Sequence, residues 1–412
     1  MAYVPFADRV SQLRPTAVNR VLHEARQLQA DGPPLISLMR GQPDTPTPAH
    51  IVEAATRSLR DGRTGYPDNQ GEPALRRAVA LKLKRDLGLA YDPDREILIT
   101  DGATLGVCTA LGALVDQQSS VLLPDPIYDA YLAPIALWGS SSAPVRATLR
   151  DGRFTFGSRE LEDSWVAAKN VILLNTPWNP VGTVLSREEL VDIMGFAEKK
   201  DCLVISDEIY ESLVYDGRRH VSPASISADA RERTILLNSL SKTYAMTGWR
   251  VGYCAGPAEI IRAMLLVLQQ SSRGPATFVQ DAATCALTSD QECTRRMALE
   301  YQGRRDQVVE SLRGIPGVEL IVPEGGLFVM VDVRGLGRPA DEIRKFLLEE
   351  SRVVVIHGSA YGPGGEGFLR VSFAAGGDGL VHGLERLREG LMRLADGPGP
   401  QIAGDFFRKD LA

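Results

Sequence analysis

The chain has 412 residues, of which 44% are hydrophobic and 24% are charged, as expected for an ordinary globular protein. Its formal net charge is −6, and its Lys and Arg residues are scattered, which argues against a nucleic-acid-binding surface and a polybasic membrane patch. The sequence contains no apolar run long enough to cross a bilayer, no signal-peptide pattern and no C-x-x-C pair among its five cysteines, so we expect a cytoplasmic protein with reduced thiols.

The first 47 residues predict an N-terminal arm followed by part of a small domain. Residues 1–15 are expected to be partly extended, residues 16–30 have the apolar spacing of a helix, and residues 35–39 form a short apolar strand. In the next segment, RGQPDTPTP at 40–48, Pro and Gly prevent regular structure. We interpret this segment as a hinge before a larger domain.

Apolar runs alternate with helical patterns between about residues 50 and 255. Several runs are apolar on both faces, as the strands of a sheet covered by helices on each side must be. One intervening helix is expected to begin at the capping box Ser186-x-x-Glu189. Alternation of this kind predicts an α/β fold with a mostly parallel central sheet flanked by helices. The expected strands are residues 96–100, 121–123, 171–175, 202–206, 234–237 and 251–255.

From about residue 286 the pattern changes to a long charged helix followed by short strands, which predicts a smaller α+β domain. The expected elements are strands at 318–322, 327–333, 353–356 and 368–373 and a helix at 340–350. We therefore divide the chain into four parts. They are an arm with part of the small domain (1–47), a large domain (48–290), a small C-terminal domain (291–395) and a tail (396–412).

The stretch NSLSKTYAMTGWRVGY, residues 238–253, carries the most informative motif. Lys242 lies in a polar turn after an apolar run, with Ser239, Ser241 and Arg250 in the same stretch. A lysine among hydroxyl groups and an arginine suits a Schiff base to an aldehyde cofactor that carries a phosphate. The lysine must lose its proton to act as a nucleophile, and burial or nearby positive charge lowers its pKa. The arginine can meet the phosphate in a two-pronged, charge-assisted contact.

This stretch closely resembles the lysine signature of the pyridoxal-phosphate-dependent class I/II aminotransferases, which belong to fold type I. A lone lysine in a loop is usually a surface residue, but other stretches between Gly41 and Arg370 match the same family in the same order. The resemblance implies the fold-type I architecture and pyridoxal 5′-phosphate as the cofactor. It also implies that Lys242 forms the Schiff base and then moves the α-proton of the substrate.

The resemblance also implies which residues bind the phosphate of the cofactor. The segment TDGAT, residues 100–104, follows an apolar run and begins a helix, where free N–H groups and a glycine make an anion site. Taken alone, the segment would be an ordinary capped turn. Tyr66, in GRTGYPDNQG, resembles the tyrosine that reaches the phosphate of the neighbouring subunit, which implies a homodimer with shared active sites. The implied phosphate ligands are Gly102, Ala103, Thr104, Ser239, Ser241 and Arg250, with Tyr66 from the partner.

The ring of the cofactor has its own implied contacts. Asp207 ends the apolar run CLVISD, where a carboxylate could hold the pyridine nitrogen protonated and make the cofactor an electron sink. Without the family match, an Asp after a strand is more often a turn or cap residue. Asn179 and Tyr210 would donate to the phenolic oxygen, although a plain Asn-Pro turn is the alternative for Asn179. Tyr128 falls where a ring would stack on the cofactor, and a core tyrosine is nearly as good an interpretation.

Three residues are candidates for binding the substrate as well as Asn179. Arg370, in FLRVSFA, interrupts an apolar strand, and a charge in such a place is rarely left unpaired. A structural salt bridge would satisfy it, but the resemblance implies a bidentate grip on the α-carboxylate of the substrate, with Gly41 adding a backbone contact. Arg273, in SSRGPATF, lies in a segment that approaches the partner's active site in the family. It could bind an acidic side chain or the phosphate edge, or remain solvated.

The choice of substrate is weakly encoded in the sequence. Some relatives that act on acidic substrates have a lysine where Ala103 stands, which lowers the case for aspartate. Trp178 and Tyr128 would favour aromatic or long apolar substrates.

We therefore expect an aminotransferase that moves the α-amino group of an L-amino acid to a 2-oxo acid through a Schiff base on Lys242. Another pyridoxal-phosphate reaction on the same scaffold (a lyase, decarboxylase, racemase or oxidase) stays open, because all of them need the same cofactor-binding residues. The five histidines show no metal-ligand spacing, and residues 358–362 do not match the nucleophile elbow G-x-S-x-G. The sequence thus predicts neither a metal site nor a serine hydrolase.

Overall fold

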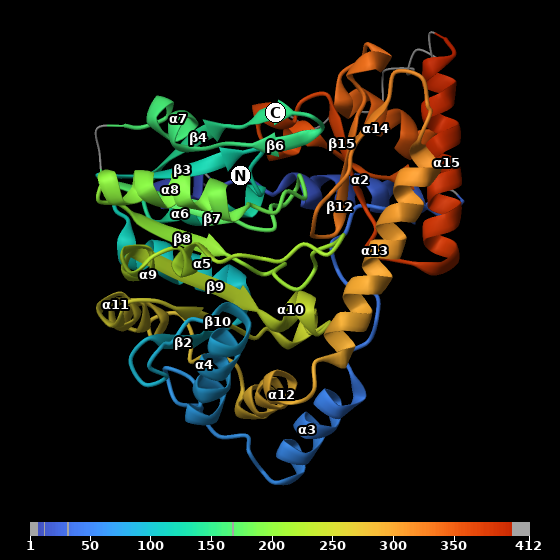
Figure 1. The fold of residues 1–412 in the computed structure, drawn as a ribbon. Coiled ribbons are helices and arrows are strands. Elements are labelled where there is room, and N and C mark those ends of the chain that lie inside the picture. Colours follow the sequence, from blue (N-terminus) through green and yellow to red (C-terminus); the bar gives the residue numbers. More distant parts are fainter. Residues whose placement is uncertain (1–6, 12, 31–32, 167–168, 398–412) are drawn as a thin grey trace, which may run out of the picture.

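The structure of the chain is a computed structural model that describes residues 7–11, 13–30, 33–166 and 169–397 (Figure 1). Residues 1–6 of the predicted arm and residues 398–412 of the predicted tail lie outside this description. The arm contains a short helix, α1 (Asp8–Ser11), where we expected partly extended chain, because a single turn is too short to show a helical period in the sequence. The predicted helix that follows is present as α2 (Ala17–Ala30).

Within the described residues, a seven-stranded sheet forms the centre of the molecule (Figure 1). Its strand order is β2-β10-β9-β8-β7-β3-β4. Strands β4, β3, β7, β8 and β9 run parallel to one another, whereas β10 is antiparallel to both of its neighbours, β2 and β9. The prediction of a mostly parallel sheet is confirmed, with β10 as the exception. The strands are β2 (Ile97–Thr100), β3 (Ser119–Asp125), β4 (Ser141–Arg146), β7 (Lys169–Asn175), β8 (Leu203–Asp207), β9 (Thr234–Ser239) and β10 (Gly252–Ala255).

Helices cover both faces of this sheet, as the two-sided apolar strands predict. Leu173 and Ile205 pack in one layer with α5 and α11, whereas their neighbours Ile172 and Val204 pack on the other face with α8. None of the helices in the described residues is both long and apolar enough to span a membrane. The helices of this part are α3 (Ala49–Arg60), α4 (Pro73–Leu87), α5 (Gly102–Leu114), α6 (Leu132–Leu137), α7 (Ser158–Asp163), α8 (Arg187–Lys199), α9 (Ala228–Arg233), α10 (Leu240–Thr243), α11 (Ala258–Leu268) and α12 (Thr277–Thr288).

The capping box at the start of α8 is confirmed. Ser186 Oγ accepts a hydrogen bond from Glu189 N at 3.2 Å, and Glu189 Oε2 accepts one from Ser186 N at 2.8 Å. Each side chain thus satisfies a backbone N–H group that the first turn of a helix leaves free.

Three strands were not expected from the sequence. They are β4 at the edge of the central sheet and the hairpin of β5 (Thr148–Arg150) with β6 (Arg153–Thr155). In β4, SSAPVR, Val145 is fully buried while most of its neighbours are exposed. An edge strand with one apolar anchor shows no alternation that the sequence could reveal.

A second group of elements follows the long helix α13 (Glu292–Leu312). Its four-stranded antiparallel sheet has the order β11-β12-β15-β14 within the described residues. The expected strand at 353–356 is divided, because β13 pairs in parallel with β1 while β14 pairs with β15. The elements are β1 (Ile36–Ser37), β11 (Glu319–Ile321), β12 (Phe328–Asp332), α14 (Ala340–Glu349), β13 (Val353–Val354), β14 (Ile356–His357), β15 (Phe368–Ser372) and α15 (Gly377–Ala395).

Two observations support the proposed division into domains. The pairing of β1 with β13 joins the N-terminal segment to the second group of elements. Helix α13 begins beside α12, where Cys293 packs on the large-domain core, and its later residues Val308 and Leu312 lie in the core of the second group (Figure 1). The boundaries at 48, 291 and 396 stay a proposal.

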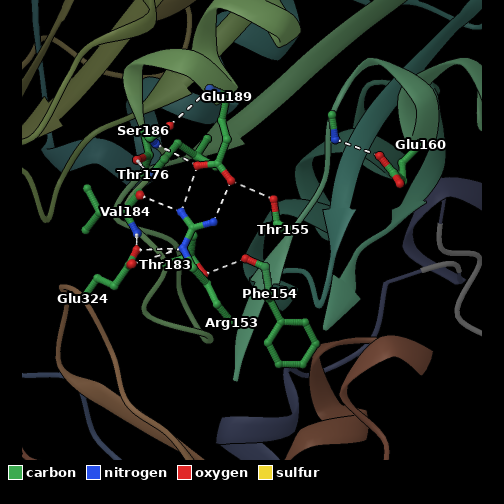
Figure 2. Close-up of polar contacts among 12 residues, drawn as sticks. Arg153, Phe154, Thr155, Glu160, Thr176, Thr183, Val184, Ser186, Glu189 and Glu324 are labelled. Atoms are coloured by element: carbon green, nitrogen blue, oxygen red, sulfur yellow. Dashed lines mark hydrogen bonds and ion pairs between the residues drawn. The ribbon is translucent and has the colours of Figure 1, made fainter. Parts of the chain in front are cut away.

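A cluster of ion pairs fastens the second group of elements to the central part (Figure 2). Arg153 on β6 donates to both carboxylate oxygens of Glu189, at 2.6 and 2.8 Å, and its Nε lies 3.1 Å from both oxygens of Glu324. Glu324 precedes β12 and also accepts a hydrogen bond from Val184 N at 2.9 Å. This network holds in place the segment that leads into β12. The first residue of β12, Phe328, contacts residues of the candidate site described below.

Candidate active site

The candidate site lies where three neighbouring parallel strands end. Strands β7, β8 and β9 finish at Asn175, Asp207 and Ser239, and the carboxyl ends of parallel strands meet at the same edge of a sheet. A pocket at this edge contains many of the residues that the sequence predicts for the cofactor. Those among its lining residues are Ala103, Thr104, Tyr128, Asp207, Ser239, Ser241, Lys242 and Arg250.

Lys242 lines this pocket and lies on the short helix α10, which Ser239 caps. Its Nζ donates a hydrogen bond to the carbonyl oxygen of Gly41 at 2.6 Å. Burial, together with the smaller effects of the positive charges of Arg250 and Arg370, lowers the pKa of Lys242 to about 8, against the opposing effect of Asp207. About a tenth of this amine is therefore neutral and nucleophilic at pH 7, and about half of it at pH 8.

An anion cradle occupies one side of the pocket. Helix α5 begins at Gly102, whose φ is +80°, and a Cβ at this position would lie 2.6 Å from Arg250 Nη2. Arg250 itself has a φ of 52°, which for a non-glycine residue costs about 1–3 kcal/mol, and its guanidinium donates to the Asp101 and Thr247 carbonyls at 3.2 and 3.1 Å. The free N–H groups of a helix start and a guanidinium are donors that suit a phosphate.

Asp207 supplies a buried carboxylate to the same pocket. Tyr131 Oη donates to its Oδ2 at 2.6 Å, and Ile209 N donates to its Oδ1 at 3.2 Å. Burial raises the pKa of Asp207 to about 6, although the bond from Tyr131 opposes this rise. The group is therefore mainly ionised at neutral pH.

Three further predicted residues lie deep in the same region. Tyr128 meets the ring of Tyr131 edge-on at 5.2 Å between centroids. Asn179 Oδ1 accepts a hydrogen bond from Arg370 Nη1 at 3.2 Å. Tyr210 is buried against Phe328, and burial raises the pKa of its hydroxyl far above the ordinary value, so this phenol remains a neutral hydrogen-bond donor.

Arg370 on β15 is a buried cation. Its Nη2 donates to the Met39 carbonyl at 2.8 Å, and its guanidinium carbon lies 3.9 Å from the ring centre of Phe328 and 4.7 Å from that of Tyr361. Its Nε has no hydrogen-bond partner, and none of the acidic side chains in the described residues forms an ion pair with it. The described residues therefore do not form the structural salt bridge that was the alternative for Arg370. The unpaired charge suits the carboxylate of a substrate.

Two predicted residues do not join the site of their own chain. Tyr66 is 92% exposed, and Arg273 donates to Asn69 Oδ1 at 3.3 Å on the surface. Gly41 does reach the site, where its carbonyl group accepts a hydrogen bond from Lys242, and its expected contact with the substrate stays a prediction.

Known proteins share the sequence and the fold of this chain. Residues 33–384 match the family model described as aminotransferase class I and II. The chain belongs to this family. A probable aspartate/prephenate aminotransferase of Aquifex aeolicus is 35% identical over 391 residues, which cover 93% of this chain and 98% of the relative. The aromatic-amino-acid aminotransferase 2 of Thermococcus litoralis is 34% identical and covers 93% of this chain and 97% of its own length.

A solved structure confirms the architecture. The aspartate aminotransferase from Rhizobium meliloti matches with a TM-score of 0.91 at 31% identity, covering 95% of this chain and 100% of that one. The fold and the aminotransferase activity predicted from the sequence are thus confirmed. As a class I and II aminotransferase, the protein uses pyridoxal 5′-phosphate to move an amino group between an amino acid and a 2-oxo acid.

The pocket of this aminotransferase has the donor groups that pyridoxal 5′-phosphate requires. The start of α5, two serine hydroxyls and Arg250 offer N–H and O–H donors with positive charge for the phosphate. The absence of a Cβ at Gly102 leaves room beside that guanidinium. Asp207 offers an acceptor for the pyridine nitrogen, and Lys242 offers an amine for the aldehyde. The residues therefore fit the cofactor.

Other residues of the aminotransferase site were missed in the sequence, or were interpreted differently. Tyr131 follows Tyr128 by one helical turn in DPIYDAY, which is the signal that could have placed it at the same pocket. The two rings beside Arg370, Phe328 and Tyr361, carry no such signal. Trp178 is 2% exposed, its indole N–H donates to the Pro126 carbonyl at 2.9 Å, and it is not a lining residue of this pocket, so its location does not support the expected role in substrate choice.

Proposed function

We propose that Lys242 bears the cofactor and moves the α-proton, in an enzyme that transfers the α-amino group of an L-amino acid to a 2-oxo acid. One observation carries the proposal. A buried lysine with a pKa lowered to about 8 lies in the same pocket as an anion cradle and a buried carboxylate. Bound pyridoxal 5′-phosphate supplies an electron-withdrawing ring that acidifies the α-proton of the amino acid.

We propose that the remaining predicted residues hold the cofactor by its separate parts. The phosphate would be bound by the start of α5 and by the hydroxyls and guanidinium around it. Asp207 would accept from the ring nitrogen, Tyr210 and Asn179 would face the phenolic oxygen, and Tyr128 would cover one face of the ring. The phosphate ligands in this proposal are Gly102, Ala103, Thr104, Ser239, Ser241 and Arg250, which all lie at or beside the pocket.

Arg370, Lys242, Asp207 and Tyr210 would each have a separate role in the reaction. Arg370 binds the α-carboxylate of the amino acid, which fixes the α-carbon relative to Lys242. Neutral Lys242 accepts the α-proton at Nζ. The same nitrogen later donates this proton to complete the transfer. Asp207 remains ionised above its pKa of about 6, and Tyr210 remains a neutral donor because burial raises its pKa.

We also propose a homodimer with shared active sites. Tyr66 lies on the surface of its own subunit, so a contact between its hydroxyl and the phosphate requires a second copy of the chain. Trp138 and α11 both lie against Gly112 of α5, and the exposed apolar side chains nearby include Leu137 and Leu266, which favours a buried interface at this face. Sedimentation equilibrium tests the proposal, and a monomeric mass would contradict it.

A cytoplasmic location is the final part of the proposal for the enzyme. All five cysteines are free thiols in the structure, as is usual in a reducing compartment. Fractionation of the source cells, with immunodetection of the chain, would contradict this location if the enzyme were recovered outside the cytosol.

Arg273 is our candidate for recognising an acidic side chain of the substrate in the neighbouring subunit. The relatives named above include enzymes named for aspartate and for aromatic amino acids, so both classes of donor must be tested. Arg273 is exposed, and Asn69 is its hydrogen-bond partner in the described residues. Its guanidinium is therefore available for a carboxylate.

Arg273→Ala is expected to raise the KM for dicarboxylic donors roughly tenfold, because an exposed charge pair is worth up to about 1 kcal/mol and a more enclosed one is worth more. The KM for aromatic donors should stay within about twofold. Steady-state kinetics with aspartate, glutamate, tyrosine and phenylalanine, against 2-oxoglutarate, pyruvate and oxaloacetate, measure this difference. The control is Arg313→Ala, an exposed arginine directly after the end of α13. An equal change in the KM of all donors would exclude a role of Arg273 in substrate specificity.

A further inference from the structure

Tyr131 lies in the pocket without a role in the function proposed above. We propose that Tyr131 is a positioning residue, whose phenol O–H fixes the orientation of Asp207 and keeps this carboxyl group ionised for the cofactor. The inference rests on the proposed role of Asp207 as the partner of the pyridine nitrogen. It adds a second residue that sets the protonation state at that end of the pocket.

The geometry of the contact is the first observation. Tyr131 Oη donates to Asp207 Oδ2 at 2.6 Å between two buried side chains, the short distance of a hydrogen bond to a charged oxygen. Ile209 N donates to the other oxygen, Oδ1, at 3.2 Å. With one donor on each oxygen, the plane of the carboxylate is fixed, and each oxygen keeps a further lone pair as an acceptor.

Tyr131 is itself held in a single arrangement. It ends the 3₁₀ turn η1 (Asp129–Tyr131), where its N–H donates to the Tyr128 carbonyl at 3.1 Å. Its ring is 5% exposed and meets Tyr128 edge-on at an interplanar angle of 89°. Burial, followed by the charge of Asp207, raises the pKa of Tyr131 far above its ordinary value. The phenol is therefore a donor throughout the working pH range.

The other charged and titratable groups near Asp207 do not replace this bond. Lys242 lowers the pKa of Asp207 by its charge, whereas the adjacent Glu208 raises it. Glu208 is turned to a separate network, in which His220 Nε2 lies 2.7 Å from its Oε2, and Ser206 and Ser222 donate to its Oε1. The buried Tyr210, Tyr128 and Cys254 are neutral neighbours whose pKa values are raised by burial.

The consequence follows from the balance of these effects. Burial already raises the pKa of Asp207 to about 6 with the Tyr131 bond in place. Loss of that bond removes a donor that stabilises the charged form, so the pKa of Asp207 must rise further. The carboxyl group would then be partly protonated near neutral pH, and a neutral acid is a poorer partner for a protonated ring nitrogen.

Tyr131→Phe in the full chain, freed of cofactor, tests the proposal. The probe is pyridoxine 5′-phosphate, which has an alcohol in place of the aldehyde, so that Lys242 forms no bond to it. We expect its dissociation constant to rise roughly tenfold at pH 7, as for the loss of a hydrogen bond to a charged group. The rise should be larger at pH 6 and smaller at pH 8. Equilibrium dialysis between pH 5.5 and 8.5 measures the dissociation constant and the midpoint of its dependence on pH.

The matched control is Tyr253→Phe, because the hydroxyl of Tyr253 is also buried but has no hydrogen-bond partner in the described residues. This control should keep the wild-type affinity and midpoint. A Tyr131→Phe profile that coincides with that of Tyr253→Phe overturns the proposal. Should Tyr131→Phe fold poorly, Tyr131→His keeps an N–H donor and is expected to hold the midpoint at or below the wild-type value. A raised midpoint in Tyr131→His would also overturn the proposal.

Asp207→Asn separates this inference from the function on which it rests. We expect this variant to bind pyridoxine 5′-phosphate at least tenfold more weakly than wild type at pH 7, because the amide cannot ionise. If Asp207→Asn is impaired while Tyr131→Phe matches the control, the positioning role of Tyr131 is wrong and the role of Asp207 stands. If Asp207→Asn binds like wild type, the proposed role of Asp207 is wrong, and the positioning role falls with it.

Discussion

Lys242→Ala is expected to lower the rate of amino transfer by about 10⁴-fold or more. The substitution removes both the nucleophile for the cofactor and the base for the α-proton, and general-base catalysis alone contributes roughly 10²–10⁴-fold. Turnover with an amino acid donor and 2-oxoglutarate measures the loss. Borohydride reduction followed by peptide mapping should label Lys242 in the wild type and no lysine in the variant. The control, Lys345→Ala, removes an exposed lysine on α14 and should retain full activity.

The same lysine sets the dependence of cofactor capture on pH. Because burial lowers its pKa from 10.5 to about 8, the amine is protonated and unreactive well below pH 8 and neutral above it. The rate at which the cofactor-free chain takes up pyridoxal 5′-phosphate should therefore rise with pH and level off above about pH 8. Stopped-flow absorbance measures this rate. A rate still rising steeply up to pH 10 would show that the reactive lysine is an ordinary exposed one.

Much of the fold is visible in the sequence, because burial on both faces leaves continuous apolar runs. The run VILLN predicted β7, and CLVISD predicted β8, both to within two residues at each end. Apolar runs report burial but not strand direction, so the antiparallel β10 could not be recognised. They also do not show where a strand changes its pairing partner. The run at 353–356 was therefore predicted as one strand, although it contains two strands that belong to different sheets.

The candidate site was predictable where its chemistry follows from local position. Asp207 and Ser239 each end a buried strand, and polar groups at the carboxyl ends of parallel strands meet at one edge. The contacts that complete the site join distant parts of the chain. Lys242 contacts Gly41, 201 residues away, and Tyr131 contacts Asp207, 76 residues away. Such pairs depend on tertiary structure, and no spacing rule in a single sequence predicts them.

Arg370 shows how the structure alters an interpretation that the sequence left open. A charge within an apolar strand predicted either a salt bridge or a ligand for a carboxylate. The guanidinium lies within 5 Å of the centres of two aromatic rings, those of Phe328 and Tyr361, and has no acidic partner in the described residues. Cation–π contacts and hydrogen bonds to the Met39 carbonyl and to Asn179 Oδ1 compensate a buried guanidinium only in part. An anionic substrate would complete its coordination.

Arg370→Leu is therefore expected to lower kcat/KM for amino acid donors by roughly 10²–10³-fold, because removal of one member of a buried charge pair costs about 2–5 kcal/mol. Arg370→Lys keeps the charge but cannot form the two-pronged contact, so it should restore only part of the loss. Steady-state kinetics with amino acid donors measure both effects. Affinity for pyridoxal 5′-phosphate should change much less, since the phosphate cradle is formed by other residues.

Two comparisons make the Arg370 experiment specific to the carboxylate. Amine donors that lack the α-carboxylate should react at the same rate, however slow, with the wild type and Arg370→Leu, because the lost contact is absent in both cases. Thermal unfolding of the cofactor-free variant should show no loss of stability, since leucine replaces a buried charge that has no acidic partner among the residues that the structure describes. An equal loss of rate for amines and amino acids would instead mean that Arg370 maintains the shape of the site and does not bind the substrate.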